Sequence, residues 1–181
     1  YGTPTHVDAL SKLVRLEPEG GFKLELEYFR HWTGDITMSW EAGEPAVPDV
    51  YTDRLVELLG PARRADDAVT SVHENLAASV QRVLEQEASH VLRGAHARVP
   101  SDSLCLAGGC AMNSVANGKI RSHTPFTDVF IQPAAGDNGT ALGAALDAWH
   151  ASGSRAVAPR MEQSYWGTEY DADAIANVIR T

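Results

Sequence analysis

The chain has 181 residues, which is enough for one ordinary domain or for one large piece of a longer protein. Hydrophobic residues make up 44% of it and charged residues 22%, a balance that is typical of a soluble globular protein and excludes disordered, collagen-like and disulfide-stapled chains. Its 24 acidic and 15 basic residues give a formal charge of -9, which argues against nucleic acid or an anionic membrane as the main partner.

The N-terminal part of the chain combines a short helix, paired strands and a loop. Residues 7–12 are predicted to form the helix. Apolar and polar residues then alternate over 13–29 on both sides of a glycine pair, which predicts a β-hairpin with a glycine turn. Residues 30–48 have no sustained period and are predicted to be a long loop. Trp32 and Trp40 in this loop are expected to anchor in the core or, alternatively, to pack under a bound molecule.

Two helices are predicted next. Residues 51–59 form the first, and Gly60 followed by a proline ends it. Apolar residues recur every three or four positions over 66–92, which predicts the strongest helix of the chain, with Asp66 or Asp67 as its N-cap.

After a polar loop at 94–102, strands and helices alternate. Residues 103–107 are a compact apolar run typical of a buried strand, and 128–131 are a second short strand. Residues 113–120 and 139–149 are predicted to be helical. This order of elements is typical of an α/β layer architecture.

The C-terminal part of the chain and the two cysteines carry no recognisable binding motif. Residues 152–159 are expected to be a linker, and a further small element is expected over 165–179. Cys105 and Cys110 match neither a disulfide framework nor a zinc motif, and are expected to be small buried residues in a reducing compartment. The chain contains neither a signal-peptide pattern nor a stretch of membrane-spanning length, so a cytoplasmic location is expected.

The first candidate site is the turn after the 103–107 strand. Gly108 and Gly109 stand at the strand end and Asn113 at a helix start. Glycines let the backbone approach a ligand, and N–H groups at a helix start suit a phosphate. The alternative is a tight turn in which Asn113 only caps the helix.

The second candidate site is the turn over 132–140, which again leads from a strand into a helix. Asp137 and Asn138 stand between glycines there. Asp137 is predicted to be a ligand for a divalent metal ion or, alternatively, a helix cap. Because open α/β sheets bind ligands at the carboxyl ends of their strands, the two turns predict a shared binding crevice.

These residues are part of a wider resemblance. Residues 104–120 (LCLAGGCAMNSVANGKI) and 129–145 (VFIQPAAGDNGTALGAA) resemble the O-carbamoyltransferase family of nodulation and antibiotic-tailoring proteins. Further matching positions follow in the family's order: Tyr1-Gly2, Tyr28-Phe29, Leu59-Gly60, Arg63-Arg64, 75–81, Leu84-Glu85 and Phe126. The resemblance therefore covers most of the chain.

The resemblance implies an actin-like, ribonuclease H-like lobe, in which a mixed sheet is flanked by helices and preceded by the hairpin. It also implies an enzyme that takes carbamoyl phosphate and ATP, forms carbamoyl-adenylate and transfers the carbamoyl group to a hydroxyl of a small-molecule acceptor. Carried over residue by residue, Gly108, Gly109 and Asn113 match the nucleotide-binding turn, with Asn138 bordering it. Asp137 matches a ligand of the divalent metal, iron or magnesium, whose charge would polarise the carbamoyl carbonyl.

One departure from the family pattern suggests a fragment. The family's metal also needs two histidines at an i, i+4 spacing, and none of the seven histidines here are so spaced. We therefore expect 1–151 to be the C-terminal lobe of the transferase domain and 152–181 a linker with the start of the next domain. The N-terminal lobe and a C-terminal adenylate-forming domain would be its missing partners, and the isolated chain is predicted to be inactive.

Two alternatives stay open. The first is a sister enzyme on the same fold, such as a tRNA-threonylcarbamoyl-transferase-like or sugar-kinase-like protein. The acidic charge counts against tRNA, but the fold alone does not exclude a kinase. The second is a non-catalytic nucleotide-binding lobe. Weaker candidate residues are Arg63 and Arg64, which would contact an anionic group or, alternatively, form a solvated surface pair. Gln132 and Asn138 border the proposed crevice and Asn117 would face it, and each alternatively satisfies local backbone groups.

Overall fold

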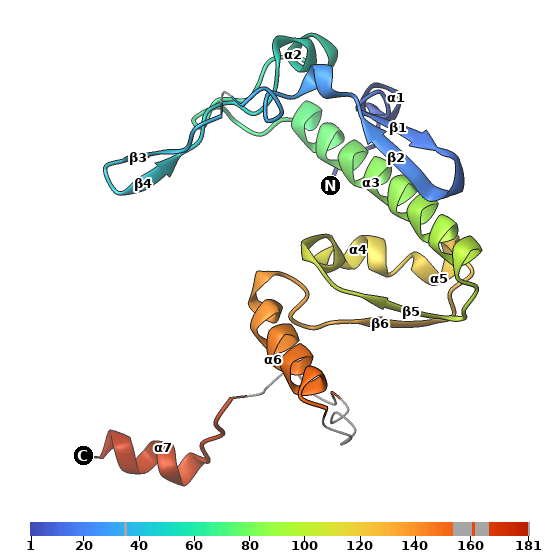
Figure 1. Ribbon diagram of the computed structural model, residues 1–181. Coiled ribbons are helices and arrows are strands. Elements are labelled where there is room, and N and C mark those ends of the chain that lie inside the picture. Colours follow the sequence, from blue (N-terminus) through green and yellow to red (C-terminus); the bar gives the residue numbers. More distant parts are fainter. Residues whose placement is uncertain (35, 154–160, 162–166, 181) are drawn as a thin grey trace. The chain divides into compact units, whose positions relative to one another are not determined.

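The computed structural model describes residues 1–34, 36–153, 161 and 167–180, and its helices and strands are drawn in Figure 1. The chain divides into two compact units, of which the first comprises Tyr1–Leu104 with Asn113–Val129, and the second Cys105–Met112 with Phe130–Thr181. Helices and short strands are both present, as the predicted α/β class requires. Over the described residues the strands form three separate two-stranded sheets, whereas the family resemblance implies a mixed sheet.

The long helix α3, Ser71–Arg98, contacts several other elements of the first unit. Its N-cap is Thr70, whose side chain accepts from the His73 backbone while the His73 ring accepts from the Thr70 N–H at 3.0 Å. The predicted cap at Asp66 or Asp67 is therefore wrong, because this reciprocal pair begins the helix several residues later. The helix also continues to Arg98, so the predicted loop at 94–102 begins only at residue 99.

Strands β1, Val14–Glu17, and β2, Gly21–Leu24, pair antiparallel and lie along α3 (Figure 1). A short 3-10 helix, η1, Pro18–Gly20, connects them. Gly20 in this connection has a φ of +80°. A Cβ on Gly94 of α3 would lie 2.4 Å from the Cα of Gly20. The connection thus contacts α3 backbone to backbone, which only glycine permits at both positions.

The N-terminal residues are bonded to the same helix. The Thr3 N–H donates to the Asn75 side chain at 2.6 Å, and the His6 N–H donates to the hydroxyl of Ser79 at 2.9 Å. Helix α1, Val7–Leu10, follows and buries Leu10. Ser79 is fully buried and donates to the Asn75 carbonyl at 2.6 Å, so the polar group inside this contact is satisfied.

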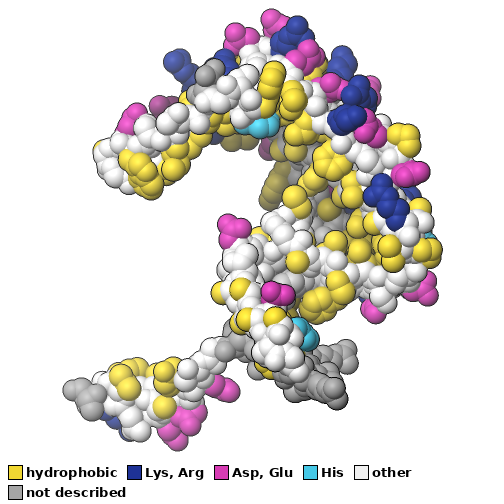
Figure 2. Space-filling model, in the orientation of Figure 1, with side chains coloured by type: hydrophobic (Ala, Val, Ile, Leu, Met, Phe, Trp, Pro, Cys, Tyr) yellow, Lys and Arg dark blue, Asp and Glu magenta, His cyan; other side chains and the backbone are white. Residues whose placement is uncertain are grey.

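The segment after β2 differs from the predicted hairpin strand and loop. Leu26–Tyr28 form a 3-10 helix, η2, and the predicted loop contains a second antiparallel pair, β3, Ser39–Glu41, and β4, Glu44–Ala46. Trp32 and Trp40 are 57% and 67% exposed, so the prediction that they anchor in the core is wrong. Figure 2 shows hydrophobic side chains at the surface of the β3–β4 pair. Helix α2 then spans Asp53–Leu59 and ends at Gly60, whose φ is +92°.

The strand-helix-strand segment begins with β5, Ser103–Leu106, and ends with β6, Asp128–Ile131. Between them lie the 3-10 helix η3, Gly109–Met112, and two short α-helices: α4, Ser114–Asn117, and α5, Ile120–His123. The Asp128 N–H donates to Asp102 at 3.0 Å and the Gln132 N–H to Leu106 at 3.1 Å. Because both partners advance by the same number of residues, β5 and β6 run parallel.

Among its described residues the second unit contains two α-helices, and the segment that joins them lies largely outside the described ranges. Helix α6 spans Thr140–Ala151, and α7 spans Ala172–Ile179 with Asp171 as N-cap. Most of the predicted linker at 152–159, and residues 165 and 166 of the small element predicted after it, lie outside the described residues. The predicted domain boundary after residue 151 stays a prediction. Within the described ranges, no helix combines the length and apolarity needed to cross a membrane.

Candidate functional site

The two predicted turns are brought together in the second unit. The Gly108 N–H donates to the carbonyl of Ala135 at 2.7 Å, which joins the glycine turn to the turn that follows β6. A Cβ on Gly136 would lie 3.0 Å from the sulfur of Met112. Gly136, the residue after Ala135, therefore lies close to Met112 at the end of the glycine turn. The sequence reasoning that both turns lie at one edge of paired strands therefore agrees with the geometry.

The glycine turn leaves its backbone accessible. Gly108 has a φ of +99°, a left-handed backbone conformation that residues other than glycine rarely adopt. Apart from the glycine itself and its chain neighbours, no heavy atom of the described residues lies within 4 Å of the position of a Cβ on Gly108 or on Gly109. This open space is what close approach of a ligand to the backbone requires, and the predicted binding role of both glycines stays a prediction.

The second turn is closed by local hydrogen bonds. The Thr140 hydroxyl donates to the Asp137 carbonyl at 2.7 Å, and the Ala134 N–H donates to the Gln132 side chain at 3.2 Å. Gln132 therefore satisfies a local backbone group, as its alternative role predicts. A Cβ on Gly139 would lie 2.0 Å from the carbonyl oxygen of Ala134, so this position has no room for a side chain.

Asp137 and Asn138 are exposed at this turn, in the 3-10 helix η4, Asp137–Gly139. The N-caps of η4 and α6 are Gly136 and Gly139, and neither helix has a side-chain cap. The alternative reading of Asp137 as a helix cap is therefore wrong. Its carboxylate is available for another role.

The described residues do not build a metal site by themselves. Over the described ranges, no group of three or more His, Cys, Asp or Glu side chains is close enough to hold an ion. Magnesium takes six oxygen ligands and iron sites in proteins also use several side chains, whereas Asp137 offers one carboxylate. The predicted metal role of Asp137 thus depends on ligands from outside these residues, and no chemical step is derived through a metal.

The histidines of α3 have structural partners. His73 forms the capping box with Thr70. The Nε2 of His90 lies 2.9 Å from the carbonyl of Glu17 and 3.1 Å from that of Gly21, which ties α3 to the β1–β2 connection. Both histidines therefore have hydrogen-bond partners within the first unit.

Asn113 belongs to the first unit and has two partners there. Its Oδ1 accepts from the Ala116 N–H at 3.0 Å, so the prediction that Asn113 caps a helix is confirmed for α4. Its Nδ2 donates to Oε1 of Gln81 on α3 at 2.9 Å, and the Gln81 Nε2 lies 3.2 Å from the Asn113 Oδ1. The two side-chain amides are therefore paired through reciprocal hydrogen bonds, a contact that the sequence pattern does not predict.

The Gln81 amide continues to a buried ion pair. Gln81 Nε2 donates to Glu85 Oε1 at 3.1 Å, and the Lys119 ammonium lies 2.6 Å from the same oxygen. The Glu85 side chain is 5% exposed and that of Lys119 39%. Burial by itself raises the pKa of a carboxyl group, but the bonds from Lys119 and Gln81 and the charges of Lys119 and Arg82 outweigh it, so the Glu85 pKa lies below its ordinary value.

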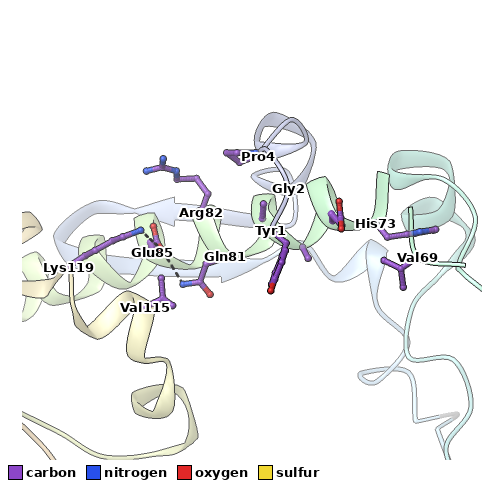
Figure 3. Close-up of a pocket in the computed structure, with 13 residues that line it drawn as sticks. Tyr1, Gly2, Pro4, Val69, His73, Gln81, Arg82, Glu85, Val115 and Lys119 are labelled. Carbon is purple, nitrogen blue, oxygen red and sulfur yellow. Dashed lines mark hydrogen bonds and ion pairs between the residues drawn. The ribbon is translucent and has the colours of Figure 1, made fainter. Parts of the chain in front are cut away.

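We call Lys119, Glu85, Gln81 and Asn113 the Asn113 network. Three of its members, Gln81, Glu85 and Lys119, line a cavity of about 800 Å³ in the first unit. Tyr1, Arg82 and Val115 also belong to the lining. Figure 3 shows Glu85, Gln81 and Lys119 turned toward one another at one end of that cavity. The available sequence signal is the spacing of Gln81 and Glu85, which stand four residues apart and therefore lie on one face of the predicted helix.

The weaker candidates have simpler roles. Arg63 donates to the carbonyls of Arg64, Ala65 and Asp67, so it closes a local turn, as the surface alternative predicts. Asn117 is half-buried in α4. Cys105 and Cys110 are free and exposed, so the prediction that they are buried is wrong. Strand β5 alternates between exposed and half-buried residues, and Cys105 is at an exposed position. Cys110 is at an exposed position of the 3-10 helix Gly109–Met112.

Comparison with known proteins identifies the family. Residues 1–146 match the model of the carbamoyltransferase N-terminus. An uncharacterised protein of Synechocystis is 37% identical over 152 residues, which is 83% of this chain and 23% of that protein. Nodulation protein NolNO of Sinorhizobium fredii is 39% identical over 127 residues, or 68% of this chain and 19% of that protein.

Nodulation protein NolO of Bradyrhizobium diazoefficiens is also 39% identical over 127 residues, which is 66% of this chain and 22% of that protein. The chain thus spans only about a fifth of the length of these relatives, with 23%, 19% and 22% of each covered. The family model includes both turns and the whole Asn113 network. The chain therefore belongs to the carbamoyltransferase N-terminus family.

Proposed function

We propose that this chain is part of an ATP-dependent O-carbamoyltransferase. Such an enzyme takes carbamoyl phosphate and ATP, forms carbamoyl-adenylate, and transfers the carbamoyl group to a hydroxyl of a small-molecule acceptor. The observation that carries the proposal is the family match over residues 1–146, which contains both candidate turns. The missing parts of the parent protein, an N-terminal lobe and an adenylate-forming domain, would complete the enzyme.

Within this proposal, the chain contributes part of the nucleotide site. Gly108 and Gly109 offer an accessible backbone, as expected where a phosphate approaches closely. Asn113 supplies a side-chain amide from the start of α4. Asn138 is exposed on the second turn, which is hydrogen-bonded to the first through Gly108 and Ala135.

The transfer step needs positioning more than it needs an acid or base from this chain. The acceptor oxygen attacks the carbamoyl carbon, the bond from that carbon to the adenylate oxygen breaks, and AMP leaves with the electron pair. The hydroxyl proton passes to a base that we do not assign. Holding the adenylate in a fixed orientation lowers the entropic cost of that attack, which is the role we assign to the glycine turn and Asn113.

Asp137 would supply one oxygen ligand of a divalent metal ion. Its carboxylate is exposed and does not cap a helix, which leaves it available for this role. The other ligands would come from parts of the parent protein outside this chain. For that reason we predict that the isolated chain does not catalyse transfer.

The test uses the full-length parent protein and carbamoyl phosphate labelled on its carbonyl carbon. We expect ATP-dependent transfer of label to a hydroxyl acceptor, and Asp137→Ala is expected to lower the rate at least about a hundredfold without unfolding the protein. Asp147→Ala is the matched control, because Asp147 is an exposed aspartate on α6.

Transfer of a phosphoryl group without carbamoyl transfer would favour the kinase alternative and contradict the proposal. Carbamoyl transfer with full activity in Asp137→Ala would retain the enzyme class but remove the metal role of Asp137. Loss of activity in both aspartate variants would point to a general effect of surface charge.

A further inference from the structure

The Asn113 network has a built-in direction that begins at Glu85. An ionised carboxylate has no hydrogen to donate, so both of its neighbours at Oε1 must donate to it. Those neighbours are the Lys119 ammonium at 2.6 Å and the Gln81 side chain at 3.1 Å. The adjacent ammonium group stabilises the ionised form.

Glu85 thereby fixes the orientation of Gln81. If the Gln81 amide were turned over, its Oε1 would face the carboxylate oxygen, and two acceptors would meet at 3.1 Å in a nearly buried position. Gln81 must therefore present Nε2 to Glu85. Its Oε1 is left to face Asn113, from which it accepts at 2.9 Å.

The same logic fixes Asn113 from two sides. Gln81 Oε1 requires a donor and meets Nδ2, while the Ala116 N–H requires an acceptor and meets Oδ1 at 3.0 Å. A turned amide would break both bonds. One hydrogen of Nδ2 is used by Gln81, and the other takes no part in these bonds.

We propose that Gln81 and Glu85 are positioning residues that hold the Asn113 amide in one orientation, with Oδ1 toward the Ala116 N–H and the NH₂ group toward Gln81, so that the second hydrogen of this NH₂ group binds an acceptor atom of the nucleotide. This inference rests on the proposed function, because it takes Asn113 to be a nucleotide contact. The ligand class follows from the orientation: a group that accepts a hydrogen bond, such as a ring nitrogen, a ribose oxygen or a phosphate oxygen. Glu85 acts on Asn113 only through Gln81.

The first experiment measures ATP affinity of the full-length protein by calorimetric titration, together with the KM for ATP, the KM for carbamoyl phosphate and kcat. Gln81→Met keeps the side-chain length and removes the hydrogen bonds of the Gln81 amide to Glu85 and to Asn113. We expect it to weaken ATP binding about fivefold to tenfold, the value of one hydrogen bond, with the KM for carbamoyl phosphate unchanged. Gln86→Met is the matched control, because Gln86 is exposed on the same helix.

The second experiment is a double-mutant cycle between Gln81→Met and Asn113→Ala. If Gln81 acts through Asn113, the double variant binds ATP no more weakly than Asn113→Ala alone. A residue with only a structural role would instead add its effect to that of Asn113→Ala. Glu85→Gln, which keeps the shape but can donate, is expected to weaken ATP binding in the same direction as Gln81→Met.

The outcomes separate this inference from the function on which it rests. If Asn113→Ala leaves ATP affinity unchanged, the nucleotide role of Asn113 is wrong. If Asn113→Ala weakens ATP binding but Gln81→Met does not, or if the two effects add, the positioning role alone is overturned. If Gln81→Met shifts the KM of both substrates equally, the change is a general one and the positioning role is likewise overturned.

Discussion

The ion pair of Glu85 and Lys119 allows a stringent test of the energetics of the first unit. Lys119→Met removes the ammonium and leaves a carboxylate that is 5% exposed, with Gln81 as its remaining side-chain donor among the described residues. Removing one partner of a buried pair costs about 3–5 kcal/mol. Lys119 is 39% exposed, so water reaches this side of the pair, and we expect a smaller loss of about 2 kcal/mol.

The assay is amide hydrogen exchange of the full-length protein, read in peptides from the middle of α3. A loss of about 2 kcal/mol in local stability speeds exchange there about thirtyfold. Exchange in α7 is the internal control, because that helix belongs to the second unit. The double variant Glu85→Leu with Lys119→Met removes both charges, and we expect it to recover most of the protection.

The pH dependence gives the same test a sign. The pKa of Glu85 in the folded protein lies below its ordinary value of 4.5, so its contribution to stability is present above pH 4.5 and is lost as the pH falls through the folded value. In Lys119→Met the burial effect is no longer offset by the ammonium, and protonation relieves the unpaired charge. The difference between the variant and the unaltered protein should therefore shrink in acid.

Wild-type exchange in Lys119→Met at pH 7 would refute the reasoning, because it would mean that the carboxylate does not need the ammonium. A double variant less protected than Lys119→Met would refute it equally. A difference that grows in acid would contradict the assigned direction of the Glu85 pKa.

Two glycine substitutions test close backbone contacts. Gly139→Ala is expected to disrupt the second turn, since a Cβ there would lie 2.0 Å from the Ala134 carbonyl oxygen; a loss of transfer activity beyond about tenfold is the readout, and Gly143→Ala, in open space on α6, is the control and should be neutral or slightly stabilising. Unchanged activity in Gly139→Ala would contradict the geometry. Gly94→Ala is expected to separate the β1–β2 connection from α3, because its Cβ would lie 2.3 Å from the Glu19 carbonyl oxygen, and faster amide exchange over 14–24 is the measurement. Gly118→Ala, where the nearest atom is at 3.5 Å, is its control, and equal exchange in the two variants would argue against the contact.

Elements with a strong local signal could be predicted from the sequence. β6 has the predicted bounds, and α2 and α6 begin and end within two residues of theirs, because a glycine turn, a proline or a run of small residues marks their ends. The bounds of α3 were harder to predict. Thr70 and His73 cap it through a reciprocal pair that involves no acidic residue, and nothing in the local pattern after Gly94 marks the extension to Arg98.

Features that depend on distant residues could not be predicted in the same way. The paired amides of Gln81 and Asn113 join positions 32 residues apart, and no local periodicity encodes such a contact. The exposure of Trp40 depends on β3 and β4, a pair too short to have a clear alternation. At the candidate site, the sequence identified both turns, but whether Gly108, Gly109, Asn113, Asp137 and Asn138 bind their ligands stays a prediction.

The position of Glu85 is itself an argument for a role beyond stability. A nearly buried ion pair contributes little net stability, and apolar side chains of similar size at the same positions often stabilise a protein more. A leucine at position 85 would suit the helix pattern, in which Val83 and Ser89 are also buried. What a leucine would not supply is an acceptor that forces Gln81, and through it Asn113, into one orientation. A variant with Glu85→Leu and Lys119→Met that keeps its fold but binds ATP more weakly would separate these two properties of the network.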